Sequence, residues 1–424
     1  MEIKNEQLMN QKKTKTIVIG GGAAGMMAAG RAAECGAQVT LLEKMGQTGR
    51  KIGISGKGRC NLTNSAPLPE FLSHFGRNGK YLRQCFNHFF TDDLIAFFED
   101  KGLPLVTERG GRIFPKSGKA LDVVKTLNSW LSQQNITVKK NSPVSSIIVQ
   151  NNEVSGVICN GQRLSCDNII LATGGKSYPR TGSTGDGYRL ASESGHTLTP
   201  IRPALVPLEC KDKKLAQLAG LNLKNINVRL YINGKRKSQE FGEVIFTGSG
   251  ISGPVILTLS STVVDYLDRS DLVSLSIDLK PGLDDKQLAN RLIRDFEKRG
   301  GEAVSSLLRG LIPYQLVDVC LDSCGIPADI DTRNFPAKTR RRLAAWLKDF
   351  RLDISGYRDF DEAIVTAGGV SLKEIEPKTM ESKYVRGLYI VGELLDIQGD
   401  TGGYNLQAAF STGWLAGSSF NPTE

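Results

Sequence analysis

The stretch TIVIGGGAAGMMAAGRAAECGAQVTLLEK, from Thr16 to Lys44, decides the fold. A β-type apolar run enters a glycine-rich turn, a helix of small residues follows, and a second apolar run ends at Glu43. This order of strand, turn, helix, strand and acid is typical of a dinucleotide-binding βαβ unit. In such a unit Gly20 permits the tight turn, Gly22 lets the backbone approach a pyrophosphate, and Gly25 brings the helix close to the sheet.

The start of the helix is the expected phosphate contact. Ala23 and Ala24 lie at the positive end of the helix dipole, where backbone N–H groups are free. Glu43 follows the second strand and is placed to accept hydrogen bonds from an adenosine ribose. A lone glycine motif can be a plain turn, but here every flanking element is present. The stretch therefore predicts a nucleotide site in an α/β fold.

The bulk composition narrows the class of protein. A chain of 424 residues is expected to form two or three domains, and it contains no apolar run long enough to span a bilayer. The polar segment Met1 to Lys15 predicts a short disordered lead-in rather than a secretory signal. Eight cysteines without a C-x-x-C pair favour reduced thiols and a cytoplasmic location, and three scattered histidines predict no metal site.

The formal net charge of +10 favours anionic partners: a dinucleotide, an acidic substrate or nucleic acid. A generally basic surface is the plainer interpretation. The strongest basic run is Lys338 with Arg340, Arg341 and Arg342, on a helix expected from Ala337 to Asp349. We expect it to be a solvated helix face, with a nucleic-acid contact that also uses Lys235 to Lys237 as the alternative.

Residues 44–64 show no helical or strand period and are rich in glycine and basic residues. A long glycine-rich connection after a nucleotide-binding unit is usually functional. Cys60 is either a redox thiol near a flat ring or, as we favour, a small packing residue. The cations available for phosphates are Arg50, Lys51, Lys57 and Arg59.

A second approach to the same cofactor is expected where the strand Asn168 to Ala172 runs into Thr173-Gly174-Gly175. The irregular segment after it is either a substrate-facing loop or a polar surface turn. Asp186 is expected to cap a helix from Gly187 to Ser194. The loop's candidates for facing a substrate are Tyr178, Arg180, Ser183 and Asp186.

The C-terminal part returns to the first sheet. A strand ends at Gly392-Glu393, where an acid can bind ribityl hydroxyls. A helix that starts after Gly403 would direct N–H groups at a phosphate or an anionic flavin edge. The middle of the chain is then an insertion.

The insertion begins where Pro200, Pro203 and Pro207 mark a boundary. Strands are expected at 228–232 and 243–247, with helices at 286–298, 314–324 and 337–349. A second G-x-G-x-x-G, Gly248 to Gly253, could bind a nicotinamide dinucleotide. Because no βαβ unit follows and Pro254 comes next, we interpret it as a turn that starts a helix.

At this point the chain resembles a known family, the BaiN/YhiN family of FAD-dependent flavoproteins, which belongs to the two-dinucleotide-binding-domain superfamily. The resemblance covers nearly the whole chain. It depends on six blocks: Lys51 to Asn64 (KIGISGKGRCNLTN), Gly111 to Val123 (GRIFPKSGKALDV), Leu171 to Tyr188 (LATGGKSYPRTGSTGDGY), Gly242 to Pro254 (GEVIFTGSGISGP), Val365 to Lys383 (VTAGGVSLKEIEPKTMESK) and Val391 to Gly413 (VGELLDIQGDTGGYNLQAAFSTG).

The resemblance implies a discontinuous Rossmann-like FAD domain, residues 1–204 and 355–424, with a β-rich insert at 205–280 that carries a helical part at 281–354. Lys57 replaces the family's usual glycine, and Gly248 replaces a frequent histidine. Together, the residues and the resemblance assign these cofactor-binding positions: Gly20, Gly22, Ala23, Ala24, Gly25, Glu43, Lys44, Arg50, Arg59, Cys60, Asn61, Thr173, Gly174, Gly392, Glu393, Gly403, Tyr404, Asn405, Leu406 and Gln407.

We therefore expect an FAD-dependent oxidoreductase that moves a hydride between flavin and a small organic substrate, either a conjugated carbonyl or an amine. NAD(P)H is the expected transient electron donor. Tyr178 and Arg180 are the candidates for polarising the substrate. The alternatives are a flavin-containing protein that binds or modifies RNA, which we favour less, and a non-catalytic FAD-stabilised scaffold.

Overall fold

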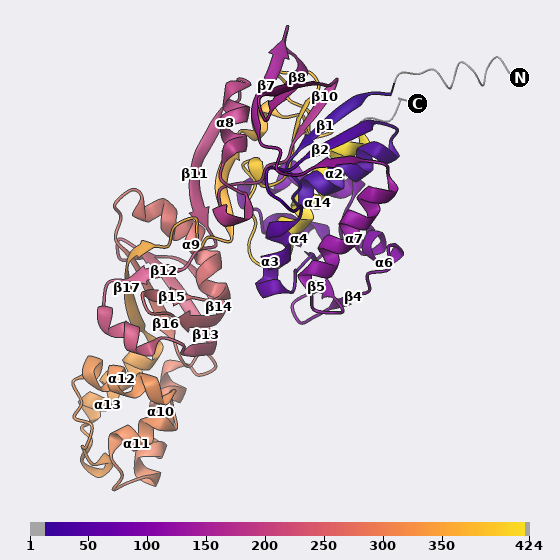
Figure 1. Cartoon of the computed structure of the whole chain (residues 1–424). Helices are drawn as coiled ribbons and strands as arrows, with labels where there is room; N and C mark the ends of the chain where they lie inside the picture. Colours follow the sequence, from indigo (N-terminus) through magenta and orange to yellow (C-terminus); the bar gives the residue numbers. More distant parts are fainter. Residues whose placement is uncertain (1–12, 420–424) are drawn as a thin grey trace, which may run out of the picture. The chain divides into compact units, whose positions relative to one another are not determined.

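The computed structural model describes residues 13–419 (Figure 1). Its contacts divide the chain into two units, one of residues up to 203 together with those from 360 onward, and one of residues 204–359. Most of the lead-in expected at Met1 to Lys15 lies outside the described residues.

The first unit contains a five-stranded sheet in the order β19-β10-β1-β2-β6. Every neighbouring pair in it is parallel. The buried side chains of β1 explain the apolar run that precedes the glycine turn. The sheet confirms the predicted Rossmann-like fold, and β19 brings the C-terminal part of the chain into it. The strands are β1 (Lys15–Ile19), β2 (Gln38–Leu42), β6 (Thr137–Lys139), β10 (Asn168–Leu171) and β19 (Leu388–Ile390).

Three helices of this unit pack together through small residues: α2 (Ala23–Glu34), α7 (Ala120–Gln133) and α14 (Tyr404–Ser418). A Cβ atom added at Gly413 of α14 would lie 2.3 Å from the carbonyl oxygen of Ala24. One added at Gly30 of α2 would lie 2.1 Å from the Trp130 ring of α7. The small residues of α2 therefore serve close backbone packing, as the sequence predicts for Gly25.

The remaining elements of the first unit surround this core (Figure 1). Three small sheets have the strand orders β3-β5-β4, β7-β8-β9 and β11-β18. Their strands are β3 (Thr63–Asn64), β4 (Leu105–Thr107), β5 (Arg112–Pro115), β7 (Val144–Gln150), β8 (Glu153–Cys159), β9 (Gln162–Ser165), β11 (Leu198–Ala204) and β18 (Val365–Val370). The helices are α3 (Arg50–Gly58), α4 (Leu68–Ser73), α5 (Arg83–His88), α6 (Thr91–Asp100) and α8 (Asp186–Glu193), with 3-10 turns η1 (Gly76–Leu82), η2 (Pro179–Thr181), η6 (Leu372–Glu374) and η7 (Gly392–Leu394).

The second unit is built on a closed barrel in the order β12-β15-β14-β13-β16-β17. The turn at Asn233-Gly234 joins its two longest strands, as the sequence predicts. The second G-x-G-x-x-G ends in a short strand and helix α9, which begins at Pro254, so it forms no βαβ unit. The barrel elements are β12 (Leu208–Cys210), β13 (Asn222–Ile232), β14 (Lys235–Phe246), β15 (Gly250–Ser252), β16 (Val273–Asp278), β17 (Phe350–Tyr357), α9 (Pro254–Leu267) and η3 (Lys213–Leu218).

A helical part lies between β16 and β17 and shares one apolar core with the barrel. The three helices predicted from sequence periodicity are present with ends shifted by up to three residues. The elements are α10 (Asp285–Lys298), α11 (Val304–Arg309), η4 (Tyr314–Leu316), α12 (Val317–Cys324), η5 (Thr332–Asn334) and α13 (Ala337–Lys348).

A buried histidine of the first unit lies beside an acid. The Nδ1 atom of His196 lies 3.3 Å from Glu374, and its Nε2 atom is buried without a hydrogen-bond partner among the described residues. Burial lowers the pKa of His196, and this effect exceeds that of Glu374, which acts to raise the pKa. Burial alone would raise the pKa of Glu374, but hydrogen bonds from Thr197 and His196 hold it below its usual value.

We expect His196→Gln to be less sensitive to mild acid than the wild type. Because the folded state binds the His196 proton less readily than the unfolded state, its contribution to stability is present above the usual histidine pKa of 6.5 and is lost as pH falls. Glu374 stays ionised in that range. Denaturation midpoints at about pH 7 and about pH 5 measure the loss, with exposed His88→Gln as the control. Equal losses in wild type and His196→Gln would contradict the expectation.

Candidate functional site

The glycine turn between β1 and α2 leaves room for a ligand at one position only. A Cβ atom at Gly20 would lie 2.5 Å from the oxygen of Ala172, and one at Gly25 would lie 1.9 Å from the oxygen of Gly20. A Cβ atom added at Gly22, the residue before α2, would have no other described atom within 4 Å. The turn is therefore closed on its protein side and open before the helix N-terminus, as a pyrophosphate requires.

Glu43 lies beside this turn. Its Oε2 atom accepts a hydrogen bond of 2.7 Å from the Gly21 amide, and its Oε1 atom accepts one of 2.7 Å from the Met45 amide. A carboxylate has about four acceptor sites, so it retains capacity for ribose hydroxyls. The acid is thus oriented by the turn that it follows.

Lys44 joins this strand end to the start of α8. Its ammonium group pairs with Asp186 at 2.6 Å and donates a hydrogen bond to Thr184. Burial acts to raise the pKa of Asp186, but the hydrogen bonds from Lys44 and Thr184 outweigh it and lower the pKa. The prediction that Asp186 caps the helix is wrong, because α8 begins at Asp186 and its cap is Gly185.

The segment after Lys44 was expected to be irregular, and this is wrong in part, because α3 spans Arg50–Gly58. The helix breaks at Ser55, after which Gly56 and Lys57 have φ angles of 55° and 57°. Lys57 therefore occupies a left-handed conformation that suits the glycine of the family pattern. Burial raises the pKa of the Cys60 thiol to about 12, which supports a packing role over a redox role.

The cations of this segment make separate contacts. Arg50 donates a 3.1 Å hydrogen bond to the carbonyl oxygen of Arg180. Arg59 forms an ion pair with Glu108 and lies 4.3 Å from the Phe114 ring centroid, at the β4–β5 hairpin. Arg50 is thus held beside the loop of residues 174–187, while Arg59 is engaged at the hairpin.

The strongest polar cluster surrounds Glu393, at the start of η7. Its carboxylate accepts hydrogen bonds from the Lys51 ammonium at 2.7 Å, the Ser177 hydroxyl at 3.0 Å and the Thr366 amide at 2.8 Å. Its side chain is 19% exposed and that of Lys51 is 26% exposed. Burial acts to raise the pKa of Glu393, but Lys51 and these donors lower it, so the group stays ionised.

Sequence reasoning predicted Glu393 but missed the roles of Ser177 and Thr366 and this pairing of Lys51. The Thr366 hydroxyl also accepts hydrogen bonds from the amides of Lys176 and Ser177, at 2.8 and 3.1 Å. No local signal connects these residues, because they come from α3, the 174–187 loop, β18 and η7.

Side-chain contacts hold the loop of residues 399–406 in place and leave backbone N–H groups at the start of α14 available to a ligand. Asn405 bonds the amide and carbonyl of Gly399, at 2.8 Å each, and the Tyr404 ring stacks on His74 with centroids 3.9 Å apart. A Cβ atom at Gly403 would lie 2.4 Å from the oxygen of Thr63. These contacts orient the free N–H groups at the start of α14, where Leu406 is half-buried.

Tyr178 and Arg180 flank Pro179 at the η2 turn. Tyr178 has a φ angle of 51° and its amide donates to the Phe360 carbonyl at 3.0 Å. Burial, and then the charge of Glu362, raise the pKa of the half-buried Tyr178 phenol, which keeps it a proton donor. The Arg180 side chain is exposed.

Buried oxygen atoms without hydrogen-bond partners in the described part of the chain support the fit of FAD to these residues. Buried polar atoms usually have a hydrogen-bond partner. Among the described residues, three of the predicted cofactor positions hold a buried side-chain oxygen without one: Asn61 Oδ1, Thr173 Oγ1 and Gln407 Oε1. A polar ligand in contact with these atoms would satisfy them. The residues described contain no cluster of three or more His, Cys, Asp or Glu that could hold a metal ion.

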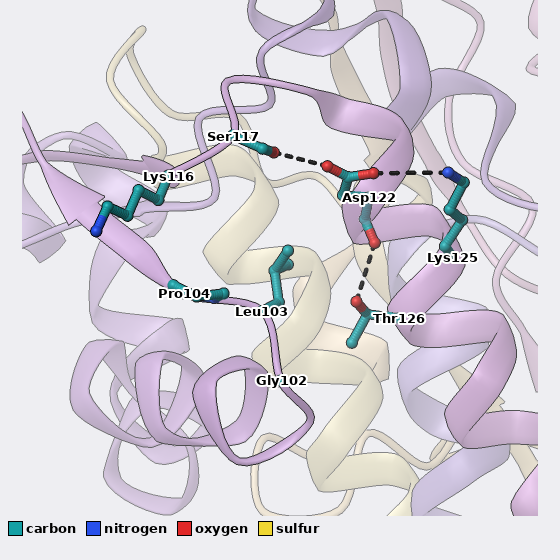
Figure 2. A pocket seen from close by; sticks show the side chains of 8 residues that line it. All are labelled: Gly102, Leu103, Pro104, Lys116, Ser117, Asp122, Lys125 and Thr126. Carbon is teal, nitrogen blue, oxygen red and sulfur yellow. Dashed lines mark hydrogen bonds and ion pairs between the residues drawn. The ribbon is translucent and has the colours of Figure 1, made fainter.

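A separate hollow of about 490 Å³ lies between the α6–β4 connection and the start of α7 (Figure 2). Asp122 in it accepts a 2.7 Å hydrogen bond from Ser117 and lies 3.7 Å from the Lys125 ammonium. None of the predicted site residues lines it, so we do not assign it to the cofactor. Its lining residues are Gly102, Leu103, Pro104, Lys116, Ser117, Asp122, Lys125 and Thr126.

Comparison with known proteins places the chain in a family. Residues 14–419 match the family described as HI0933-like protein Rossmann domain. The chain is 35% identical over 410 residues to a 3-dehydro-bile acid delta(4,6)-reductase of Clostridium scindens, covering 94% of this chain and 97% of that protein. It is 31% identical over 406 residues to a ribosomal RNA dihydrouridine synthase of Haemophilus influenzae, covering 95% and 97%.

Solved structures support the fold. A 3-ketosteroid delta1-dehydrogenase from Sterolibacterium denitrificans matches with a TM-score of 0.53 and 14% identity, over 98% of this chain and 100% of that one. In residues 13–419 we find no helix whose length and apolar character would let it cross a membrane. The predicted BaiN/YhiN membership is confirmed by the family match and the two curated relatives. The chain belongs to the HI0933-like Rossmann-domain family and is an FAD-dependent oxidoreductase.

Proposed function

We propose that this protein reduces a carbon–carbon double bond conjugated to a carbonyl group, with electrons that NAD(P)H delivers to bound FAD. The observation that carries the proposal is the near full-length similarity to the delta(4,6)-reductase of a 3-dehydro-bile acid. A dihydrouridine synthase also reduces a double bond next to a carbonyl, in uracil. The two relatives therefore share one bond type although their substrates differ greatly in size.

The residues of the first unit support a division of roles. Gly22, Ala23 and Ala24 would hold the pyrophosphate, and Glu43 the adenosine ribose. Bound FAD, once reduced by NAD(P)H, would supply a hydride for the carbon β to the carbonyl, and the α carbon would take a proton. The N–H groups at the start of α14, after Gly403, would stabilise negative charge on the cofactor.

Tyr178 and Arg180 are the proposed substrate-polarising residues. A phenol that stays protonated can donate a hydrogen bond to the substrate carbonyl, which strengthens as negative charge develops on that oxygen. We expect Tyr178→Phe to slow reoxidation of reduced flavin by a conjugated ketone by about tenfold or more, and to leave flavin reduction by the nicotinamide unchanged. Stopped-flow absorbance measures both half-reactions. An equal loss in both would instead indicate a general disturbance of the site.

The electron donor is tested first. We expect the purified protein to show a flavin spectrum that bleaches on anaerobic addition of NADH or NADPH, and to regain its colour with a conjugated ketone. A flavin untouched by both nucleotides would contradict this donor and direct the search to amines that reduce the flavin themselves. A protein that takes up no FAD would contradict the whole assignment.

A second candidate is the uracil base of RNA. The specific observation that favours it is the 31% identity to two ribosomal RNA dihydrouridine synthases, one of them from Escherichia coli. Incubation with unmodified ribosomal RNA and NADPH, followed by detection of dihydrouridine, tests it directly. Activity on a steroid-like ketone but not on RNA would favour the first substrate class.

A further inference from the structure

The second unit carries four cations on α13 that have no carboxylate partner among the described residues. Lys338, Arg341 and Arg342 are exposed and Arg340 is half-exposed. Their spacing of three and four residues places Lys338, Arg341 and Arg342 on one face of the helix. Leu343 and Leu347 bury the opposite face in the core of the unit. None of the four cations forms an ion pair with a described residue.

Seven other basic residues of this unit have carboxylate partners. These pairs are Arg229 and Lys348 with Asp278, Arg291 with Asp295, Arg299 with Glu302, Arg333 with Asp331, Arg351 with Asp349, and Arg358 with Glu209. Among the described residues, the cations of α13 have no such partner, and neither do those of the basic run Lys235-Arg236-Lys237 on β14.

The position of these charges lowers the stability of helix α13. They occupy its N-terminal half, near the positive end of the helix dipole, and its first turn contains no acid. Lys338 and Arg342 are also like charges one turn apart, which repel each other. A face that only needed to be solvated would be more stable with neutral or acidic residues, so this arrangement favours an external anion.

The residue types on this face favour a phosphate backbone as the anion. One guanidinium group can bind two oxygens of a phosphate at once, and three arginines are consecutive here. Binding to a lipid surface would need an apolar face beside the charges. None of the described side chains of α13 is a large exposed apolar one. A nucleic acid fits this face better than a membrane.

We propose that the basic face of α13, formed by Lys338, Arg340, Arg341 and Arg342, binds the phosphate backbone of RNA. The inference rests on the second candidate substrate of the proposed function and names the surface that would hold it. Contacts with phosphates carry no sequence information, so this face would supply affinity rather than base recognition.

The test is the fluorescence anisotropy of a labelled RNA hairpin with the FAD-loaded protein, between about 50 and about 200 mM salt. The variant is Lys338→Gln with Arg341→Gln and Arg342→Gln. We expect it to bind RNA at least about tenfold more weakly at low salt and to lose about one unit of salt slope for each phosphate contact removed. Its melting temperature should be unchanged or higher, because the dipole is relieved.

The matched control removes the same charge from β14: Lys235→Gln with Arg236→Gln and Lys237→Gln. Of these, Arg236 bonds Gln239 and Lys237 lies 5.7 Å from the Tyr266 ring centroid. The control should retain most RNA affinity. Equal losses in both variants, no RNA binding by the wild type, or binding only to phosphatidylglycerol vesicles would each overturn the proposal. Flavin bleaching by NADPH, measured in the same samples, reports separately on the proposed function.

Discussion

Gly22→Ala is expected to weaken FAD binding by at least about tenfold, equivalent to about 1.4 kcal/mol, while the apoprotein remains folded. The reason is that the space before α2 is empty of protein. No atom lies within 4 Å of the new Cβ, and Gly22 has a φ angle of −85°, which any residue adopts. The methyl group would instead occupy the place that the pyrophosphate needs.

Gly25→Ala, three residues later, is the contrasting variant. Its Cβ atom would lie 1.9 Å from the carbonyl oxygen of Gly20, so the turn or the helix must move. Forced overpacking of this kind costs about 1–3 kcal/mol and sometimes more. We therefore expect Gly25→Ala to lower the stability of the apoprotein itself, which Gly22→Ala leaves within about 0.5 kcal/mol of wild type.

Two measurements separate these effects: denaturation of the apoproteins, and quenching of FAD fluorescence on titration with protein. Gly36→Ala is unsuitable as a control, because Gly36 has a positive φ angle of 91°. Gly46→Ala is suitable, because the nearest atom to its Cβ would lie at 3.6 Å. A Gly22→Ala variant with wild-type FAD affinity would show that this turn does not hold the pyrophosphate.

The predictable parts of this fold are those that local patterns determine. The strand–turn–helix–strand unit, the Asn233-Gly234 hairpin and the helices of the second unit follow from periodicity and turn residues. Helix α3 does not, because glycines at 53, 56 and 58 lower its helix propensity. Its start is held by tertiary contacts instead: the Gly49 amide donates to the Gly21 carbonyl at 2.8 Å, and Gly49 packs against Val124.

The candidate site shows the same limit. Its glycines and Glu43 follow from one contiguous motif, but the partners of Glu393 are distant in sequence. Lys51 precedes it by 342 residues and Ser177 by 216. A basic residue and a serine in glycine-rich loops carry no local signal for one shared carboxylate. The parallel pairing of β10 with β19 places η7 beside the loop after β10, which brings Ser177 to Glu393.

That shared carboxylate leads to the second large effect. We expect Glu393→Gln to destabilise the apoprotein by about 1.5–3 kcal/mol, the range for hydrogen bonds to a charged group, because this ion pair is only partly buried. Glutamine fills the same volume, but it removes the charge that neutralises Lys51 and places an amide group among three donors. Lys51→Met should cost less, because the carboxylate keeps the Ser177 hydroxyl and the Thr366 amide.

The double variant distinguishes a true pair from two independent residues. If Lys51 and Glu393 act together, Lys51→Met in the Glu393→Gln background should cost little or restore stability, with a coupling energy of about 1–3 kcal/mol. The matched control is the exposed pair Arg59–Glu108, with 45% and 31% exposed side chains, for which we expect a coupling below about 1 kcal/mol. Additive losses at Lys51 and Glu393 would contradict the pairing.

The pH dependence gives an independent check of the same pair. The pKa of Glu393 is held below its usual value of 4.5, so its ionised form stabilises the folded state above that pH. This contribution is lost as pH falls through the lowered pKa, because the folded state must then bind the proton. The gap in stability between wild type and Glu393→Gln should therefore be constant near neutrality and shrink only in acid below about pH 4.5. A gap that closes between pH 5 and 7 would contradict the lowered pKa of Glu393, because the His196–Glu374 pair is present in both proteins and cancels in the difference.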